Sequence, residues 1–414
     1  MPTLLSVNSY YYRRDGSEVV FLEHNRLFKE AGWTVVPFAM QHPENLSTEW
    51  GRYFVTELEF GSDYSLLDKL VRIPKVIYSL EARRQIALLI DRTQPDICHC
   101  HSIYHHLSPS ILGSLRNAGI PVVMTLHDLK IACPAYHMAN SGGICEQCKG
   151  GRLHNVLVNR CIKGSSPLSA LLMGEAILHS ALGSYSAGVN VFVAPSRFYI
   201  DKLVEWGWSR EKFVHVPNSV DVAQLEPAYA SGSHFLYFGR LSPEKGLMTL
   251  VRAAARSGVS VHLAGHGPQM EELQREVHRL DAPVHFLGHL GGEELIAAIG
   301  ASRATVLASE WYENAPMSIL ESYALGKPVI AARIGGIPEL LAENHTGWLF
   351  ESGSVNQLAD TLRSVALMPG SAIEQFGRAA RRLAEQEYSG TLYRQRIGDL
   401  YSRVRGAERD ALQP

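Results

Sequence analysis

The sequence has no run of about 18 uninterrupted apolar residues, the length that a helix needs to cross a bilayer. Its first residues, Met1 to Val7, carry no basic leader before a long apolar stretch, so we expect no signal peptide. No internal repeat and no low-complexity tract interrupts it. The formal net charge is only −2, which gives no overall attraction to nucleic acid. These absences favour a cytoplasmic protein without a nucleic-acid partner.

Cysteine is also sparse. Six occur among 414 residues, and four of them crowd between positions 133 and 161. In a reducing compartment such a cluster indicates metal or redox chemistry before a disulfide framework. Hydrophobic residues make up 46% and charged residues 19%, the balance of a globular protein. The length favours two domains.

What the sequence does have is a regular alternation of short apolar runs and helix-period segments, which predicts α/β folding with parallel sheets. The predicted strands are Thr3–Asn8, Trp33–Phe38, Asp96–His101, Pro121–His127, Val189–Ala194, Phe213–Pro217, Phe235–Gly239, Ser260–Gly265, Val284–Leu287, Ala304–Ala308 and Pro328–Ala332. Between the predicted strands Phe213–Pro217 and Phe235–Gly239, the segment Asp221–Ser233 lacks periodicity and resembles an interdomain linker. Each half is expected to form a doubly wound, Rossmann-like sheet, and two facing sheets would enclose a cleft.

The expected domains follow from this division. Residues 1–222 form the first, with a cysteine-rich insertion at about 130–165, and residues 223–387 form the second. Residues 388–414 are expected to pack back on the first domain, because Tyr388–Arg405 has apolar residues at helical spacing.

The segment from Glu310 to Pro328 is the most informative. A buried-type strand runs into a loop, and Pro316 stands where a first helical residue is favoured. Glu313 lies in that loop, and Glu321 lies five residues beyond Pro316, about 7.5 Å along the helix axis at 1.5 Å per residue. The free N–H groups at the helix start would attract a diphosphate. Two ordinary solvent-facing glutamates are the alternative, and the flanking residues argue against it: Asn314, Ala315, Pro316 and the Gly326 stop.

A second motif, Phe238–Gly246, ends a predicted strand with a tight turn. Its cations Arg240 and Lys245 would neutralise a pyrophosphate leaving group, and the alternative is two solvated surface charges. The glycine-rich turns Gly265–Pro268 and Arg333–Glu339 follow other strands of the same predicted sheet. The combination of glycines and cations at successive strand ends favours a nucleotide site.

These motifs, between about Phe235 and Leu362, resemble the donor domain of the retaining GT-B glycosyltransferases of family 4. That family shows a Gly-Arg-Leu…Lys-Gly turn, a Gly-x-Gly-Pro turn and a Glu-x7-Glu motif. The resemblance implies that Arg240 and Lys245 bind the donor diphosphate. It also implies that Glu313 contacts the donor sugar and Glu321 the ribose. The further donor-binding residues that it implies are Gly16, Gly239, Gly265, Gly267, Asn314, Ala315 and Pro316.

In the first half, the family usually has two adjacent glycines in the loop after the first strand, where this sequence has Asp15 and Gly16. A second strand ends in Thr125-Leu-His-Asp128, where the family often has a histidine near the reacting sugar. A lone histidine at a strand end is more often structural. With Asp128 beside it, we favour a catalytic role for His127, as a hydrogen-bond partner of a donor hydroxyl.

The four clustered cysteines have the spacing C-x11-C-x2-C-x12-C and predict a structural zinc ion, since a C-x2-C pair supplies two of four tetrahedral ligands. Disulfides, a redox-labile cluster and four unlinked thiols are the alternatives. The resemblance places this insertion beside the acceptor cleft, because some family members share it. The cysteines are Cys133, Cys145, Cys148 and Cys161.

A basic and apolar stretch is compatible with peripheral contact with the inner membrane surface, where a lipid-linked acceptor would lie. An ordinary amphipathic surface helix, interrupted by Pro74, is the alternative. The basic residues are Lys69, Arg72, Lys75, Arg83 and Arg84.

The sequence has no Asp-x-Asp, the metal clamp of many one-domain glycosyltransferases, so we expect no catalytic metal. The resemblance implies an enzyme that moves a hexose-type sugar, with retention, from a UDP- or GDP-sugar. The acceptor is a hydroxyl of a glycan or lipid-linked molecule, in cell-surface polysaccharide or glycolipid synthesis. The alternatives are another GT-B enzyme, such as an epimerase or phosphorylase, and a non-catalytic subunit that binds sugar nucleotides.

Overall fold

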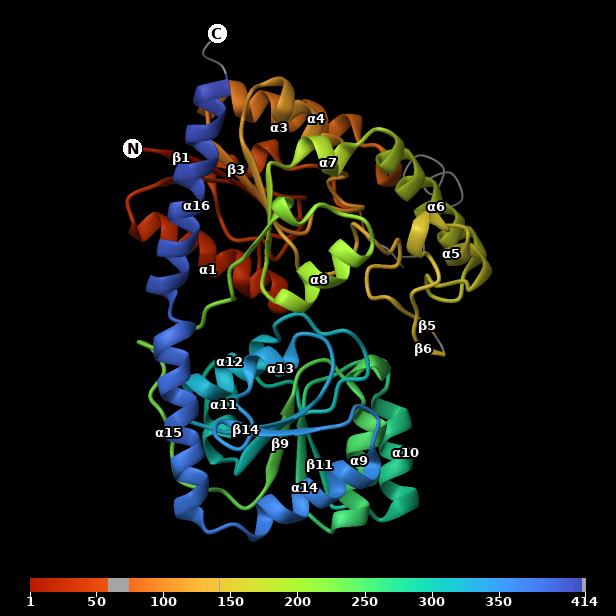
Figure 1. Cartoon of the computed structure of the whole chain (residues 1–414), viewed down its shortest axis with the longest axis vertical. Coiled ribbons are helices and arrows are strands. Elements are labelled where there is room, and N and C mark those ends of the chain that lie inside the picture. Colours follow the sequence, from red (N-terminus) through yellow and green to blue (C-terminus); the bar gives the residue numbers. More distant parts are fainter. Residues whose placement is uncertain (59–73, 141, 412–414) are drawn as a thin grey trace. The chain divides into compact units, whose positions relative to one another are not determined.

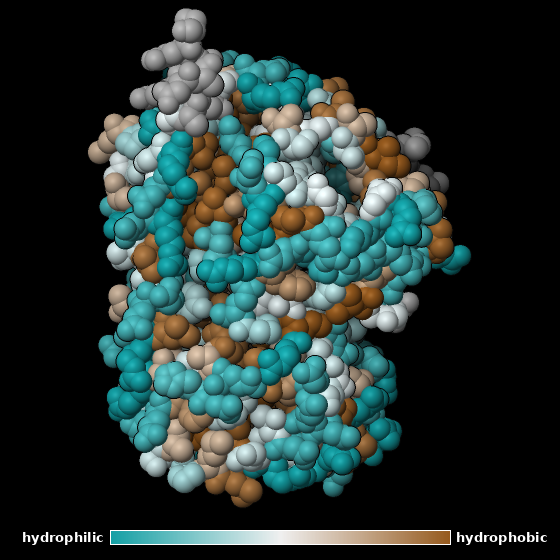
Figure 2. Space-filling view, in the orientation of Figure 1, coloured by the Kyte–Doolittle hydropathy of each residue, from teal (hydrophilic) through white to brown (hydrophobic). Residues whose placement is uncertain are grey.

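The computed structural model describes residues 1–58, 74–140 and 142–411, and side chains as far as residue 406. It divides into two compact units, one made of Met1–Val216 with Tyr393–Pro414 and the other of Pro217–Leu392. Figure 1 shows a sheet with surrounding helices in each unit. No helix of the described residues is long and apolar enough to pass through a bilayer. Figure 2 shows hydrophilic residues over most of one face of the molecule, with hydrophobic residues among them.

The first unit contains a six-stranded parallel sheet of order β2-β1-β3-β4-β7-β8. Its strands are β1 Thr3–Val7, β2 Thr34–Phe38, β3 Ile97–Cys100, β4 Val122–Thr125, β7 Val191–Ala194 and β8 Phe213–His215. Its helices are α1 Gly16–Glu30, α3 Leu80–Thr93, α4 Ser110–Asn117, α5 Asn155–Val158, α6 Ser166–Ala181, α7 Ser184–Gly188 and α8 Arg197–Glu205. A two-residue hairpin, β5 Ala139–Asn140 with β6 Gly143–Ile144, lies in the cysteine-bearing segment.

The second unit contains a parallel sheet of order β11-β10-β9-β12-β13-β14, the strand order of a dinucleotide-binding Rossmann fold. Its strands are β9 Phe235–Phe238, β10 Val261–Ala264, β11 Val284–Gly288, β12 Ala304–Leu307, β13 Val329–Ala332 and β14 Gly347–Phe350. Its helices are α9 Leu247–Ser257, α10 Met270–Leu280, α11 Gly292–Ala301, α12 Met317–Ala324, α13 Ile337–Leu340, α14 Val355–Leu367 and α15 Gly370–Glu387. The predicted α/β class with two Rossmann-like sheets is confirmed.

Local sequence explains where most of these elements begin. Apolar strands such as β9 and β12 are buried along their whole length, as expected for parallel strands covered on both faces. Hydroxyl side chains cap several helices by accepting a bond from an early backbone N–H. These caps are Ser79 of α3, Ser165 of α6, Ser196 of α8 and Ser354 of α14. Helix α1 has a capping box made by Asp15 and Glu18.

The last helix, α16 Gly390–Ala411, begins two residues later than the sequence pattern predicts. Helix α15 ends at Glu387, and the chain bends at Tyr388, whose carbonyl oxygen accepts from Val220 N at 2.8 Å, before Ser389 forms a parallel bridge with Val220. The predicted helix start at Tyr388 is therefore wrong. Helix α16 then packs on the first sheet through its buried apolar side chains: Tyr393, Ile397, Leu400, Tyr401 and Val404.

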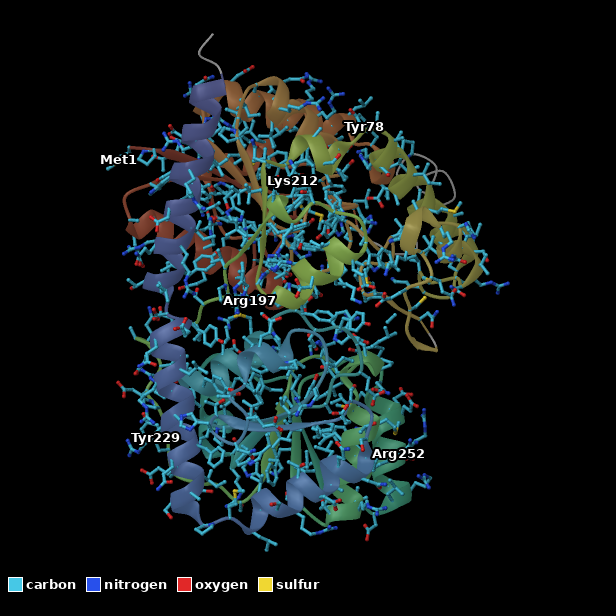
Figure 3. All side chains as sticks on the ribbon, viewed as in Figure 1. Met1, Tyr78, Arg197, Lys212, Tyr229 and Arg252 are labelled. Carbon is cyan, nitrogen blue, oxygen red and sulfur yellow. The ribbon has the colours of Figure 1, made fainter. Side chains whose placement is uncertain are left out.

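The segment Asp221–Ser233 contains no helix or strand, and it is fixed to the second unit by backbone contacts. Arg381 donates to the carbonyls of Val222 and Leu225, and Lys327 Nζ donates to Ala230 O at 2.7 Å. Tyr229, labelled in Figure 3, packs against the end of α12 with the Arg378 guanidinium 4.2 Å from its ring centre. The segment is therefore part of the second unit and not a loose connection.

Candidate functional site

The strand order of the second unit reverses between β9 and β12, and ligands of such sheets bind beyond the carboxyl ends of the strands at this switch point. The loop after β9 carries Arg240 and Lys245, and the loop after β12 carries Glu313. The predicted donor residues of this unit are therefore gathered on loops that leave the expected edge of the sheet.

Glycines allow the loops after β9 and β10 to touch backbone to backbone. A Cβ on Gly265 would lie 1.9 Å from Gly239 O, and one on Gly267 would lie 2.3 Å from Leu241 O. Leu241 N donates to His266 O at 3.0 Å across the same contact. Gly239 and Gly265 also have φ values of +140° and +142°, where other residues are strained. The three predicted glycines thus shape the turn that presents Arg240, whose side chain is exposed.

Lys245 and Glu313 form an ion pair at the switch point, although 68 positions separate them. Lys245 Nζ donates to Glu313 Oε1 at 2.7 Å, and Ser309 Oγ donates to the same oxygen at 2.6 Å. The Glu313 side chain is only 7% exposed and that of Lys245 is 21% exposed. The Lys245 ammonium also lies 5.0 Å from the centre of the Trp311 ring. The pair is therefore held in a partly enclosed site with an aromatic wall.

The surroundings of Glu313 keep it ionised. Burial alone would raise its pKa, but the charge of Lys245 and the hydrogen bonds from Lys245, Ser309 and Trp311 lower the pKa below its ordinary value. Gly336 N donates to Glu313 O at 2.8 Å, and a Cβ on Gly335 would lie 2.3 Å from that oxygen. The glycine-rich turn after β13 therefore supports the backbone of the glutamate loop.

Helix α12 begins beside this pair with Pro316 at its cap, and the side chain of Pro316 makes no capping hydrogen bond. Asn218 Nδ2 donates to Ala315 O at 3.0 Å, which fixes the approach to the helix. Asn314 and Ala315 are buried. Glu321 lies in the second turn of the helix and is half-buried. The first N–H groups of a helix have no intrahelical partners, so this end is suited to an anion.

The first unit holds the other predicted catalytic and donor-binding residues, Gly16 and His127. Gly16 is the first residue of α1 and follows Asp15, the cap of that helix. His127 follows β4, and its Nε2 lies 2.9 Å from His101 Nδ1. Burial lowers the pKa of His127 to about 4, so the ring is neutral at pH 7.

Asp128, next to His127, belongs to a buried polar group. It accepts from Tyr104 Oη at 3.0 Å and from Lys130 N at 2.9 Å. Burial raises its pKa to about 6, against the lowering effect of those bonds. Lys130 Nζ pairs with Glu175 at 2.7 Å, and this pair ties the strand-end loop to α6.

The four clustered cysteines are free thiols. The pKa of Cys148 is raised to about 12, mainly by burial and further by the nearby thiols of Cys133, Cys161 and Cys145. Three ligand atoms that share a metal ion must lie close together. Among the described residues, His24, His99 and His101 have ring nitrogens within 4.8 Å of one another, but no three of the cysteine sulfurs do. Around a zinc ion with 2.3 Å bonds, thiolate sulfurs lie about 3.8 Å apart. The donor set suits zinc, but its sulfurs are spread more widely than a bound ion requires.

Part of the basic stretch predicted to meet a membrane lies outside the described residues, namely Lys69 and Arg72. Within them, Lys75 Nζ pairs with Glu81 at 2.7 Å, and Arg83 donates to Tyr78 Oη at 2.8 Å. Both cations therefore have partners inside the protein.

Several residues of the site were not predicted from the sequence. Ser309, Trp311 and Asn218 contact Glu313 or its loop, and Gly335 supports it. Only Gly335 had a sequence signal, as part of a glycine-rich turn. The contacts of Ser309 and Trp311 depend on how the loop around Glu313 folds, and the contact of Asn218 joins segments 97 positions apart.

Two family models match the chain. "Glycosyltransferase Family 4" matches residues 14–224, which is half of the chain, and "Glycosyl transferases group 1" matches residues 227–383. The chain belongs to this glycosyltransferase family. The matched residues lie in both units and include all of the predicted site residues of the glycosyltransferase.

Relatives of the glycosyltransferase include glycogen synthase of Mycobacterium tuberculosis, 32% identical over 43% of this chain and 44% of that protein. A sulfoquinovosyl transferase of Arabidopsis thaliana is 33% identical over 75% of this chain and 58% of its own length. The matches thus span about half the length of these relatives. The crystal structure of Anabaena HepE in complex with UDP has a TM-score of 0.68 at 17% identity, covering 97% of this chain and 100% of that one. That likeness supports the GT-B fold.

Proposed function

We propose that the protein transfers a hexose-type sugar from a nucleotide-sugar donor to a hydroxyl of a glycan or lipid-linked acceptor, with retention at the anomeric carbon. The observation that carries this proposal is the partly enclosed Lys245–Glu313 pair beside the start of α12, at the switch point of a Rossmann sheet. A cation and a helix start are the groups that stabilise a departing diphosphate. The UDP complex of HepE, similar in fold, supports a nucleoside diphosphate as the leaving group.

Each site residue has a role in this proposal. Arg240 and Lys245 bind the diphosphate, and the glycine turns allow it to approach the backbone. Glu313 contacts the donor sugar, while Glu321 accepts from the ribose. Neutral His127 hydrogen-bonds a hydroxyl of the reacting sugar.

The transfer step needs few groups from the protein. The bond between the anomeric carbon and the phosphate oxygen breaks as the acceptor oxygen attacks from the same face. The proton of the acceptor hydroxyl moves to the departing phosphate oxygen, so that charge and atoms balance. The protein supplies orientation and stabilises the negative charge that grows on the diphosphate. Inversion of the product anomer, measured from its NMR coupling constants, would contradict this step.

Donor binding is the first test. We expect one of the UDP-, GDP-, ADP- or dTDP-sugars to raise Tm by about 5–10 °C at 100 times its Kd, because binding to the folded state alone adds about 2.7 kcal/mol. In Arg240→Gln that shift should shrink at the same concentration, because a diphosphate contact is lost. Equal shifts in both proteins would contradict the role of Arg240. Conversion of the labelled donor without any acceptor would instead indicate an epimerase.

We also propose that zinc binds the four cysteines and draws their sulfurs together. We expect elemental analysis of the purified protein to give about one zinc per chain, because four thiolates form a closed tetrahedral site. The variant Cys145→Ser/Cys148→Ser should lose that zinc, whereas Cys98→Ser, which changes a buried thiol of β3, should keep it. Much less than one equivalent in the unchanged protein would favour unlinked thiols.

The proposed setting is the synthesis of cell-surface polysaccharide or glycolipid, at the cytoplasmic face of the membrane. A lipid-linked acceptor would require peripheral contact with that surface.

A further inference from the structure

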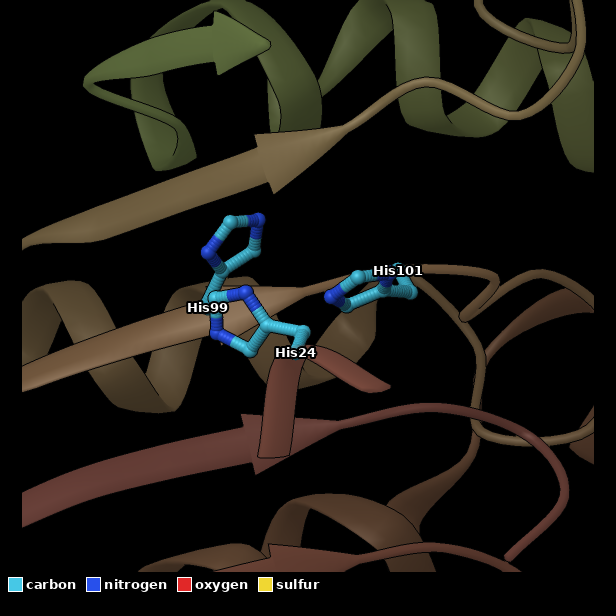
Figure 4. A group of neighbouring side chains, drawn as sticks. All are labelled: His24, His99 and His101. Carbon is cyan, nitrogen blue, oxygen red and sulfur yellow. The ribbon is translucent and has the colours of Figure 1, made fainter. Parts of the chain in front are cut away.

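The first unit contains a buried cluster of histidines that the proposed function uses only at one end. His24 comes from α1, His99 from β3 and His101 from the residue after β3, as Figure 4 shows. All three side chains are completely buried. One ring nitrogen from each lies within 4.8 Å of the others. His101 also forms a hydrogen bond with His127, the predicted catalytic residue of this unit.

Hydrogen bonds occupy two of these rings fully. His24 Nδ1 and Nε2 each lie 3.0 Å from a tyrosine hydroxyl of α16, that of Tyr393 and that of Tyr401. His99 Nδ1 lies 2.6 Å from the Tyr401 hydroxyl, and His99 Nε2 lies 2.8 Å from Thr125 Oγ1. A metal ion would have to displace these hydroxyls to obtain three nitrogen ligands. The cluster is therefore a hydrogen-bonded scaffold rather than a metal site.

His101 stands between this scaffold and His127. Its ring stacks on His99 with centres 4.8 Å apart and on His127 with centres 5.2 Å apart. The edge of Phe21 lies against it at 5.2 Å. Because the rings on either side hold its plane, His101 Nδ1 is directed at His127 Nε2.

In the hydrogen bond between His101 Nδ1 and His127 Nε2, either His101 or His127 is the donor. Burial lowers the pKa of both His101 and His127, so both are neutral at pH 7 and each carries one ring proton. If His127 donates from Nε2, the proton of His101 must lie on its own Nε2. That nitrogen is buried and has no hydrogen-bond partner among the described residues. A buried N–H without an acceptor is among the rarest features of folded proteins, so His101 is the donor.

We propose that His101 is a positioning residue that fixes His127 as the tautomer protonated on Nδ1. His127 then presents an N–H group, and not a lone pair, to its ligand. Under the proposed function, on which this consequence rests, that ligand is an oxygen of the reacting sugar. His127 acts there as a hydrogen-bond donor and does not remove a proton from the acceptor.

Two-bond ¹H–¹⁵N NMR of the full protein with labelled histidine tests this at pH 7, with His127→Gln to assign the signals. We expect His127 in the unchanged protein to be protonated on Nδ1 alone. In His101→Phe, which keeps a stacked ring but removes the donor, the two tautomers should mix. The same variant should lower kcat by about 10-fold to 100-fold with the donor KM changed less than about threefold, as expected for a residue that orients another.

His24→Phe is the matched control, because His24 contacts the His101 ring but not His127. It should leave the His127 tautomer unchanged. Protonation of His127 on Nε2 in the unchanged protein would overturn the proposal, and so would an unmixed tautomer with normal kcat in His101→Phe. If the unchanged protein transferred no sugar from any donor, the proposed function would fail while the NMR result would still decide the tautomer.

Discussion

Glu313→Gln is expected to lower kcat for sugar transfer by about 100-fold to 1,000-fold, the usual cost of removing one preorganised electrostatic group. The amide oxygen can still accept from Lys245 Nζ and Ser309 Oγ, so the loop geometry should persist. Under the proposed role of Glu313, what is lost is a negative charge beside the donor sugar, where positive charge develops as the glycosidic bond breaks. Initial rates with the donor identified by thermal shift would measure the effect.

The matched control is Glu310→Gln, the same change three residues earlier in the same loop. Glu310 accepts from Thr249 Oγ1 at 2.6 Å and does not contact Lys245. We expect its kcat to change less than about threefold. The Kd of the nucleoside diphosphate alone should be similar in both variants, because Glu313 is assigned to the sugar. Normal transfer by Glu313→Gln would show that the site has been misassigned.

The sequence predicts the fold well where the signal is local. The run Phe235-Leu-Tyr-Phe238 is apolar over its full length, and most of the other strands are mainly apolar and bounded by glycine, proline or aspartate, so strands could be placed to within one or two residues. The strand β14 was missed although strands of the same length were predicted, because it begins with a glycine and follows a polar loop. The break at Tyr388 was missed because it depends on a backbone contact with Val220, 168 positions earlier.

In the candidate site, too, the residues with a local sequence signal were predicted and the contacts between distant segments were not. Arg240, Lys245 and Glu313 were predicted from residue types at strand ends, which is local information. Their loops were predicted to lie at one edge of a sheet, but the strand order that places β9 beside β12 arises from long-range pairing. The bond from Lys245 to Glu313 therefore came only from the structure. The role of Ser309 in that bond had no pattern in the sequence at all.

Lys245→Met is expected to lower Tm by about 6–12 °C at pH 7, independently of any substrate. Removing one partner of a buried ion pair costs about 3 kcal/mol or more, because the remaining charge stays desolvated. A change of 1 kcal/mol shifts Tm by about 2–4 °C in a unit of this size. Glu313 is the charge left behind, with 7% of its side chain exposed. Thermal unfolding of both proteins at several pH values would measure the difference.

The pH dependence separates this cause from a simple loss of packing. In the unchanged protein the pKa of Glu313 lies below its ordinary value of 4.5, so the pair adds stability above that pH and loses it as the pH falls further. In Lys245→Met only the hydrogen bonds from Ser309 and Trp311 still oppose burial, so the pKa of Glu313 rises. Ionised Glu313 then destabilises the variant increasingly as the pH rises past about 4.5. The Tm difference should therefore be large at pH 7 and small near pH 4. Lys245→Met/Glu313→Gln should recover most of the loss at pH 7, since no buried charge remains. A difference that stayed constant from pH 4 to pH 8 would mean that Lys245 stabilises the unit by the packing of its methylene groups rather than by its charge.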